Sequence, residues 1–391
     1  MINRERCIGC EICQVVCPVN AIEMKNDKEG FRYPHINLNQ CVHCNKCEQE
    51  CPIQKSDIEE IRKFDIKWMC GHFKNPKETL KSSSGGFATA LARNFIKNQG
   101  VVFGVAYAKN FKSAEFRCAT TMDEIEDFRG SKYVQTRKQD LYIKIKHYIQ
   151  QKRKVLIIGL PCDIGAVVSY FASNPDLNLI YTCELICHGV TSEKVLTEYQ
   201  HSILKDSLAA VTNFELRHKD EKWAPFYIKT QYDNGTYIKE PYSDSIYKKT
   251  FFVLLRESCY QCLYKGNNSK ADITIGDYWG ISEKDAAFQK EGVSAILVRS
   301  SKGQSLLNGL EEYELFSADS KIICDCNPSI LFATKKHELR DEFSEQFQSN
   351  GIISACEWLD KRTDLQNNQK KKNMRVMEKL RCVLRLIQKR N

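Results

Sequence analysis

Residues 7–18 read CIGCEICQVVCP, and residues 41–52 read CVHCNKCEQECP. Both have the spacing Cys-x2-Cys-x2-Cys-x3-Cys-Pro, which supports cubane iron–sulfur clusters. In such a repeat one loop gives three ligands of a cluster, and the fourth comes from the other repeat because each proline turns its chain away. We therefore predict two 4Fe–4S sites. The first set of ligands is Cys7, Cys10, Cys13 and Cys51, and the second set is Cys41, Cys44, Cys47 and Cys17.

Zinc is the alternative for closely spaced thiols. Structural zinc sites favour CxxC pairs that are separated by a longer loop, and this repeat lacks that arrangement. Between the two motifs, residues 21–24 and 31–36 read as short strands. Residues 1–55 are thus predicted to form a bacterial two-cluster ferredoxin domain.

Composition narrows the class of protein. The 19 cysteines are odd in number, which argues against a disulfide framework. The formal charge is +9, but residues 370–391 hold nine Lys or Arg and one Glu, so the remainder is close to neutral. We expect no nucleic-acid partner, because no basic face is evident. The longest uncharged run, residues 164–175, is too short to span a bilayer, and we expect a cytoplasmic protein.

Beyond the cysteine repeat, the pattern divides the chain into further segments. Residues 56–80 read as a polar linker, 81–190 as an α/β domain, 191–345 as an α+β domain and 346–391 as a helical basic tail. The fold class is therefore a ferredoxin domain followed by a mixed α/β and α+β body. Helices are predicted at 87–96, 141–149, from 192, and at 245–255; strands at 100–108, 154–159, 178–187, 212–217, 227–232, 237–241, 272–276 and 294–299.

Four more cysteines suggest a third metal site. Cys162 and Cys187 each follow an apolar strand, and Cys259 and Cys262 form a CxxC pair. Ligands of α/β proteins gather where parallel strands end. These four thiols (the third set) are a candidate for another 4Fe–4S cluster. Isolated buried cysteines are the alternative. Seven further thiols are expected to be ordinary: Cys70, Cys118, Cys183, Cys324, Cys326, Cys356 and Cys382.

A small-residue loop precedes the first predicted helix of the body. Ser82 to Gly86 read SSSGG. Small residues let the backbone approach a phosphate, and a helix N-terminus offers free N–H groups. A serine-rich helix cap would give the same letters.

Together these segments resemble the coenzyme F-420 (deazaflavin) hydrogenase/dehydrogenase beta-subunit family, in its form with a fused two-cluster ferredoxin domain. The segments that carry the resemblance occur in the family's order over residues 1 to about 330. They are SSGGF at 83–87, GSKYVQ at 130–135, GLPC at 159–162, CHGV at 187–190, the CxxC pair at 259–262, and ADITIGDYWG at 271–280.

The resemblance implies FAD, with a cluster of the third set beside it. The implied flavin-binding residues are Ser83, Ser84, Gly85, Gly86, Ser131, Lys132, Tyr133, Asp277 and Trp279. Lys132 would lie near a phosphate or the flavin N1/C2 edge, where a cation stabilises reduced flavin; a solvated surface lysine is the alternative. Asp277 and Trp279 would close the site or form a structural turn. His188 would protonate a substrate or cap a strand end.

The function predicted from these features is an FAD- and 4Fe–4S-dependent oxidoreductase. It would pass electrons from ferredoxin or a reduced deazaflavin to an organic substrate, for which a polysaccharide-synthesis intermediate is one candidate. The alternative is an electron-transfer subunit of a hydrogenase or dehydrogenase complex. Apolar residues at helical spacing in 376–387 suggest that the basic tail lies on the inner membrane surface, on its own core, or on a second subunit such as a second copy.

Overall fold

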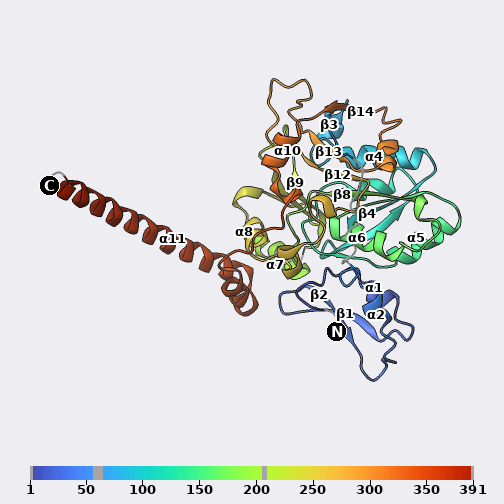
Figure 1. Ribbon diagram of the computed structural model, residues 1–391, viewed down its shortest axis with the longest axis horizontal. Coiled ribbons are helices and arrows are strands. Elements are labelled where there is room, and N and C mark those ends of the chain that lie inside the picture. Colours follow the sequence, from blue (N-terminus) through green and yellow to red (C-terminus); the bar gives the residue numbers. More distant parts are fainter. Residues whose placement is uncertain (1–2, 56–64, 205–208, 389–391) are drawn as a thin grey trace.

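The computed structural model describes residues 3–55, 65–204 and 209–388, with side chains described as far as residue 365. In its N-terminal part, β1 (Ile22–Asn26) and β2 (Arg32–Ile36) form an antiparallel pair, as the sequence predicts. Two short helices, α1 (Ile12–Val15) and α2 (Lys46–Gln49), each follow the first cysteines of one repeat. This ferredoxin-like part lies at one end of the larger body (Figure 1).

A nine-stranded mixed sheet forms the centre of the body, in the order β14-β3-β13-β12-β8-β7-β4-β5-β6. Its middle strands β12, β8, β7 and β4 are parallel to one another, so their carboxyl ends meet at one edge. This confirms the mixed α/β class. The strands are β3 (Lys67–Phe73), β4 (Val101–Tyr107), β5 (Ala114–Ala119), β6 (Thr136–Arg137), β7 (Val155–Gly159), β8 (Ile180–Leu185), β12 (Ile273–Asp277), β13 (Ser294–Val298) and β14 (Tyr313–Ser317).

Helices cover both faces of this sheet. Val102 and Leu156 pack on the side of α4 (Phe87–Lys97) and α9 (Ser301–Leu306), whereas their neighbours Val101 and Val155 pack on the side of α5 (Leu141–Gln150) and α6 (Pro161–Tyr170). Successive side chains of a strand point to opposite faces, so an all-apolar strand is buried on both sides. Ile12 of the ferredoxin-like part joins the α5/α6 cluster, which docks that part on this face.

A second core lies beside the large sheet. It joins β9 (Val211–His218), β10 (Tyr227–Tyr232) and β11 (Tyr237–Pro241), an antiparallel sheet, to α7 (Glu193–Ile203), α8 (Ile246–Val253) and the start of α11. The helices and strands predicted here agree with these bounds to within a few residues. Smaller elements complete the body: α3 (Pro76–Leu80), α10 (Ser320–Cys326) and the 3-10 turns η1 (Glu124–Phe128), η2 (Leu177–Leu179), η3 (Tyr242–Asp244), η4 (Glu257–Gln261), η5 (Gly266–Asn268) and η6 (Pro328–Ile330).

Two sequence expectations about segment limits differ from the structure. Residues 67–73, inside the predicted linker, form β3 between β13 and β14. The end of β3 is buried, and its Gly71 and His72 pair with Leu315 and Glu314 of β14 in the sheet. The two segments predicted as separate α/β and α+β domains also share one sheet, since β12 pairs with β8. Residues 56–64 lie outside the described part.

The chain ends in a long helix, α11 (Arg340–Gln388), which confirms a helical tail. Its backbone breaks at Gly351, where φ is 78°, a conformation that glycine adopts readily. Just beyond the break, Ile352, Ala355 and Leu359 still pack in the second core. Further along, the helix projects away from the body (Figure 1). Side chains at 376–387, on which the amphipathic pattern was predicted, lie outside those described. Among the described residues, no helix combines the length and apolar character needed to cross a bilayer.

Candidate functional site

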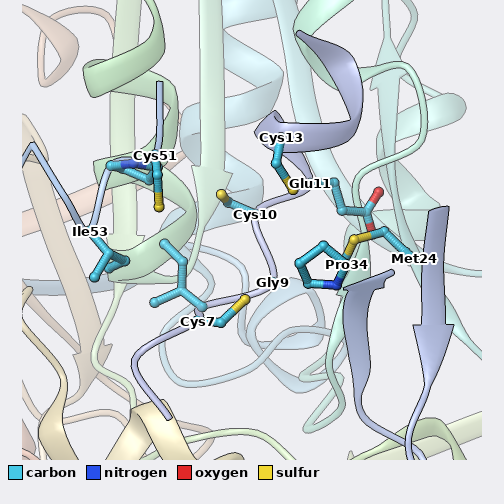
Figure 2. A pocket seen from close by; sticks show the side chains of 11 residues that line it. Cys7, Gly9, Cys10, Glu11, Cys13, Met24, Pro34, Cys51 and Ile53 are labelled. Carbon is cyan, nitrogen blue, oxygen red and sulfur yellow. The ribbon is translucent and has the colours of Figure 1, made fainter. Parts of the chain in front are cut away.

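The four cysteines of the first set line one small cavity within the ferredoxin-like part, whose lining residues all lie between Cys7 and Ile53. Figure 2 shows the side chains of Cys7, Cys10, Cys13 and Cys51 around this cavity. Cys7 and Cys10 come from the loop that leads into α1, Cys13 lies within α1, and Cys51 follows α2. The crossing of ligands between repeats that the spacing predicts thus corresponds to a spatial group, although their role as ligands remains a proposal.

Backbone conformation brings the first three thiols together. Gly9 and Glu11 both have left-handed backbones, with φ of 67° and 65°. A Cβ at Gly9 would lie 2.4 Å from Nε2 of Gln135, a residue of the body. Glycine is therefore required at this position both for the turn and for the close approach of the body.

Burial keeps two first-set thiols protonated when no metal is bound. Burial raises the pKa of Cys10 to about 12, with a smaller contribution from Cys7 and Cys51. It also raises the pKa of Cys13. Ionised thiols would repel one another in this cavity, so the group suits a cofactor whose iron binds thiolates and releases their protons.

The second set lies at the surface. Cys44 is exposed, and Cys41 is close enough to Cys47 to raise its pKa, although burial is the larger cause. The sulfur of Cys17 accepts a hydrogen bond from the Ala21 amide at 3.2 Å. Of this set, the structure shows directly that Cys41 and Cys47 are neighbours.

The four thiols of the third set are neighbours although they come from distant segments. Cys162 begins α6 after β7, Cys187 follows β8, and Cys259 and Cys262 belong to the η4 turn and its end. Burial is the main cause of their raised pKa values, which are about 11 for Cys187 and about 12 for Cys259. Repulsion from the thiolates of Cys187 and Cys262 also raises the pKa of Cys162. The same two thiols raise the pKa of Cys259.

No group of three His, Cys, Asp or Glu side chains within the described ranges is compact enough to hold a single metal ion. A cubane is larger, because its thiolates bind different irons around the cluster. The absence of a single-ion site therefore does not bear on the cluster prediction, and the ligand roles of the first and third sets stay predictions.

Tyr264 contacts both the first set and the third. It shares one apolar cluster with Cys51 and Ile53, against which Cys162 and Cys262 also pack. Gly165 in α6 makes room for the ring, since a Cβ there would lie 2.0 Å from it. One aromatic side chain thus contacts two groups of thiols.

Beyond the third set lies a cavity of about 560 Å³. This volume is within the range of cofactor sites. Cys187 and His188 line it, so the third set is part of its wall. Of the predicted flavin-binding residues, all line this cavity except Gly85: Ser83, Ser84, Gly86, Ser131, Lys132, Tyr133, Asp277 and Trp279.

The two predicted flavin loops meet in the wall of this cavity. The hydroxyl of Ser83 lies 3.0 Å from that of Ser131. Gly85 lies behind the wall, where its amide donates to Ser294 Oγ at 3.0 Å and a Cβ would lie 2.2 Å from the Gly71 carbonyl. Gly85 therefore serves packing, whereas Gly86 (φ 85°) begins α4 at the cavity itself.

Asp277 anchors this wall. Arg217 donates to both of its oxygens, at 2.7 and 3.0 Å, Ser84 Oγ donates at 2.6 Å, and Trp223 Nε1 donates at 3.0 Å. Burial alone would raise the pKa of Asp277, but Arg217 lowers it below its ordinary value. Trp279 stacks on Trp223 with ring centroids 4.5 Å apart. Asp277 and Trp279 thus form a hydrogen-bonded structural turn, and this turn is also part of the cavity wall.

Two lysines support this wall: Lys132 lines the cavity and is half-buried, whereas Lys219 is buried behind the serine loop. Lys132 Nζ donates to the carbonyls of Asp127 at 3.0 Å and Arg129 at 2.6 Å, and burial lowers the pKa of Lys132 to about 7. Lys132 is half-buried at the cavity wall, and its role toward a flavin stays a prediction. Lys219 donates to three carbonyls, including that of Ser84 at 2.6 Å, and so holds the serine loop.

His188 lies between the third set and the cavity. Its Nδ1 is 2.9 Å from Ser329 Oγ. Burial, with a further contribution from Lys265, lowers the pKa of His188 below its ordinary value. The ring is therefore neutral at pH 7 and can accept a proton.

Several of these residues carry no pattern in the sequence. Arg217, Lys219 and Tyr264 are single residues without informative spacing, and only the fold brings them to the site. Arg256 is another; it lies against the first set. For Tyr264 alone the sequence offers a signal, because this aromatic residue lies in the Tyr-rich stretch that holds the Cys259 and Cys262 pair.

Comparison with known proteins identifies two parts of the chain. Residues 152–321 match the family model for the C terminus of the coenzyme F420 hydrogenase/dehydrogenase beta subunit. Residues 6–55 match the 4Fe–4S dicluster domain. The first match contains the third set, and the second contains the first and second sets.

Among curated proteins none matches, whereas 13 chains of solved structures do. One belongs to the F420-reducing NiFe hydrogenase complex from Methanosarcina barkeri, studied by xenon derivatization. It is 17% identical, with a TM-score of 0.45, over 76% of this chain and 92% of that one. By these two matches, residues 6–55 form a domain of the 4Fe–4S dicluster type, and residues 152–321 are similar to the C terminus of the coenzyme F420 hydrogenase/dehydrogenase beta subunit.

Proposed function

We propose that this chain is an electron-transfer subunit of a hydrogenase- or dehydrogenase-type complex, which exchanges electrons between its ferredoxin-like part and a deazaflavin. The observation that carries the proposal is the position of Cys187, which belongs to the third set and also lines the 560 Å³ cavity. With Tyr264 in contact with both the first and third sets, three groups of thiols lead from the surface to a cofactor-sized cavity.

The residues fit the groups that this function requires. The first and second sets would hold the two clusters of the dicluster domain, and the third set would hold another. The cavity would hold FAD between the loop at Ser83–Gly86 and the segment at Ser131–Tyr133. When bound, such clusters carry single electrons, and a flavin exchanges single electrons for a hydride.

The chain's own residues prepare this cavity for an anionic cofactor. Lys132 can donate a charged hydrogen bond at pH values below about 7, since its pKa is about 7. Asp277 fixes Arg217 and Ser84, and Lys219 fixes the backbone of the serine loop. His188, neutral at pH 7, is available to accept a proton beside Cys187.

The subunit function is favoured over a reductase with its own organic substrate. The cavity is lined by apolar and small residues together with the cations described above, and no contact in the described part favours a polysaccharide-synthesis intermediate. Ferredoxin and a reduced deazaflavin are the candidate donors. The later part of α11, which projects from the body (Figure 1), would offer a separate site for a partner subunit or an anionic membrane.

The test is reduction of the clusters by a reduced deazaflavin. Anaerobically purified chain would be mixed with reduced coenzyme F420, and cluster signals followed by EPR. We expect signals of the dicluster domain to appear with the intact chain and to be lost in Cys162→Ala, in which the flavin alone should bleach. Cys324→Ser, a thiol outside the three sets, is the control. Equal reduction in Cys162→Ala would contradict the role of the third set, and no reduction by coenzyme F420 in the intact chain would contradict the deazaflavin.

A further inference from the structure

Arg256 is a cation in the deepest part of the contact between the body and the ferredoxin-like part. It lies at the start of the η4 turn (Glu257–Gln261), just before Cys259. Its side chain is 1% exposed. Its amide donates to the carbonyl of Val190 at 3.1 Å, which fixes its backbone to the segment that follows Cys187.

The guanidinium of Arg256 reaches across to the first set. Nε donates to the Cys7 carbonyl at 2.8 Å, Nη1 donates to the Arg32 carbonyl at 3.0 Å, and Nη2 lies 3.5 Å from the sulfur of Cys7. The ring of Tyr33 lies under the guanidinium at 4.0 Å from its centroid. The side chain is therefore held in one orientation by a carbonyl, a thiol and an aromatic face.

This cation has no carboxylate partner among the described residues, since none lies within 4.0 Å of it in the described ion pairs. Arg340, which also joins the two parts, is by contrast paired with Glu29 at 2.7 Å. An arginine side chain stays protonated in proteins, and a buried charge without a partner costs several kcal/mol. The fold therefore leaves a buried positive charge beside Cys7.

The anion that this charge lacks is supplied by an all-thiolate cluster, whose net charge is about −2 in the oxidised state. We infer that Arg256 is the counter-ion of the cluster held by Cys7, Cys10, Cys13 and Cys51, and that it raises the reduction potential of this cluster. This inference rests on the proposed function, since it needs the first set to bind a cluster.

The physical reason is that reduction adds a negative charge. A fixed cation and an N–H donor to a ligand sulfur both stabilise the more negative state. The second set lies at the surface and has Cys44 exposed to water. Water stabilises the reduced state of a cluster at that surface, and Arg256 gives the buried first-set cluster a stabilisation that burial would otherwise withhold. Electrons that reach the second set can then move inward, toward Tyr264 and the third set.

The experiment is an EPR-monitored redox titration of the full chain, purified without oxygen. Arg256→Met is expected to lower the reduction equilibrium constant of one dicluster signal at least tenfold, which is about 59 mV for a one-electron couple, while iron content stays at the level of the intact chain. The signal of the second set would be assigned by its loss in Cys44→Ala, and it should not shift in Arg256→Met.

Two further variants separate charge from packing. Arg340→Met removes a buried arginine from the same contact without touching a thiol, and should leave both potentials unchanged. Arg256→Lys keeps the charge and should restore at least half of the shift. Should Arg256→Met lose first-set iron, retention of that iron in Arg256→Lys supports the counter-ion role, and its loss in both variants overturns it.

The outcomes also distinguish this inference from the proposed function. Clusters present in the intact chain with no shift in Arg256→Met would overturn the inference alone. Absence of the first-set signal from the intact chain would overturn the proposed cluster assignment, and the inference with it.

Discussion

The first cysteine set lies much deeper in the molecule than the second, although the two share one spacing. The first set faces the body: Ile12, next to Cys13, packs among residues of α5 and α6, and Tyr142 of α5 donates to the Cys10 carbonyl at 2.8 Å. The second set faces solvent at Cys44. A repeated motif thus becomes an inside and an outside site because only one copy docks on the rest of the fold.

This difference indicates where the direction of electron flow can come from. Identical ligands give similar clusters, and the protein tunes them through charge, hydrogen bonds to sulfur and exposure. The first set has Arg256 and Tyr264 around it, whereas the second set has an exposed thiol. Variants on either side should therefore differ in their consequences, and the strongest consequence is expected for the cluster ligands themselves.

Loss of one ligand from each set should have unequal effects on stability. Cys10→Ala should lower the unfolding temperature by on the order of 10 °C, because its cluster lies in the contact with the body and metal binding is coupled to folding. Cys44→Ala should lower it by a few degrees at most. Differential scanning calorimetry of the anaerobic variants measures both, and equal shifts would remove the contrast.

The buried ion pair on the inner side should matter nearly as much. Arg340 Nη1 and Nη2 lie 2.7 Å from the two oxygens of Glu29, and the arginine side chain is 5% exposed. Arg340→Met leaves Glu29 without its partner and should destabilise the chain by about 3–5 kcal/mol. Denaturant unfolding followed by tryptophan fluorescence checks this, and a loss below about 1 kcal/mol would mean that the docking contact is weak.

The far end of the path should respond to pH. Lys132 is charged below its pKa of about 7 and neutral above it, so an anionic flavin should bind more tightly at pH 6 than at pH 8, by roughly tenfold. Lys132→Met should remove the pH dependence, and Lys248→Met, at the same cavity, should keep it. Fluorescence titration with FAD measures this. A stronger affinity at pH 8 in the intact chain would show that Lys132 does not contact the cofactor.

The weakest effect is expected on the outer side. Lys55 and Glu50 form an ion pair at 2.6 Å, but both side chains are 39% exposed. Glu50→Gln should change the free energy of unfolding by less than about 1 kcal/mol. The same denaturant experiment serves here, with Arg340→Met as its reference; a comparable loss in both would argue that depth is not what separates the two sides.

The sequence predicts those parts of the site in which the cysteines occur at characteristic intervals or positions. The cluster repeats give a crossed set that includes Cys51, because the geometry of a two-cluster domain is encoded in its prolines and intervals. The third set follows from the rule that parallel strands end at one edge, which applies to Cys162 and Cys187 because β7 and β8 are parallel neighbours.

The remaining parts depend on contacts between distant segments. Arg256 and Lys219 look like ordinary basic residues until the fold buries them. The sequence did not predict β3 for another reason. The lysines and polar residues that flank 67–73 give the segment a linker-like composition. Its own run from Trp68 to Phe73 is nevertheless apolar enough to enter a sheet. Side-chain burial of this kind is a property of the whole fold and is not carried by local pattern.

Whether three groups of thiols lead to a flavin can be decided by the iron, sulfide and flavin content of anaerobically purified chain, with spectra before and after dithionite. We expect about twelve irons, an equal amount of sulfide and one FAD, since three cubanes hold four irons each, and we expect Cys162→Ala to lose about four of these irons. About eight irons and no flavin would contradict the proposed path, because the third set would then hold no cluster and the cavity no cofactor.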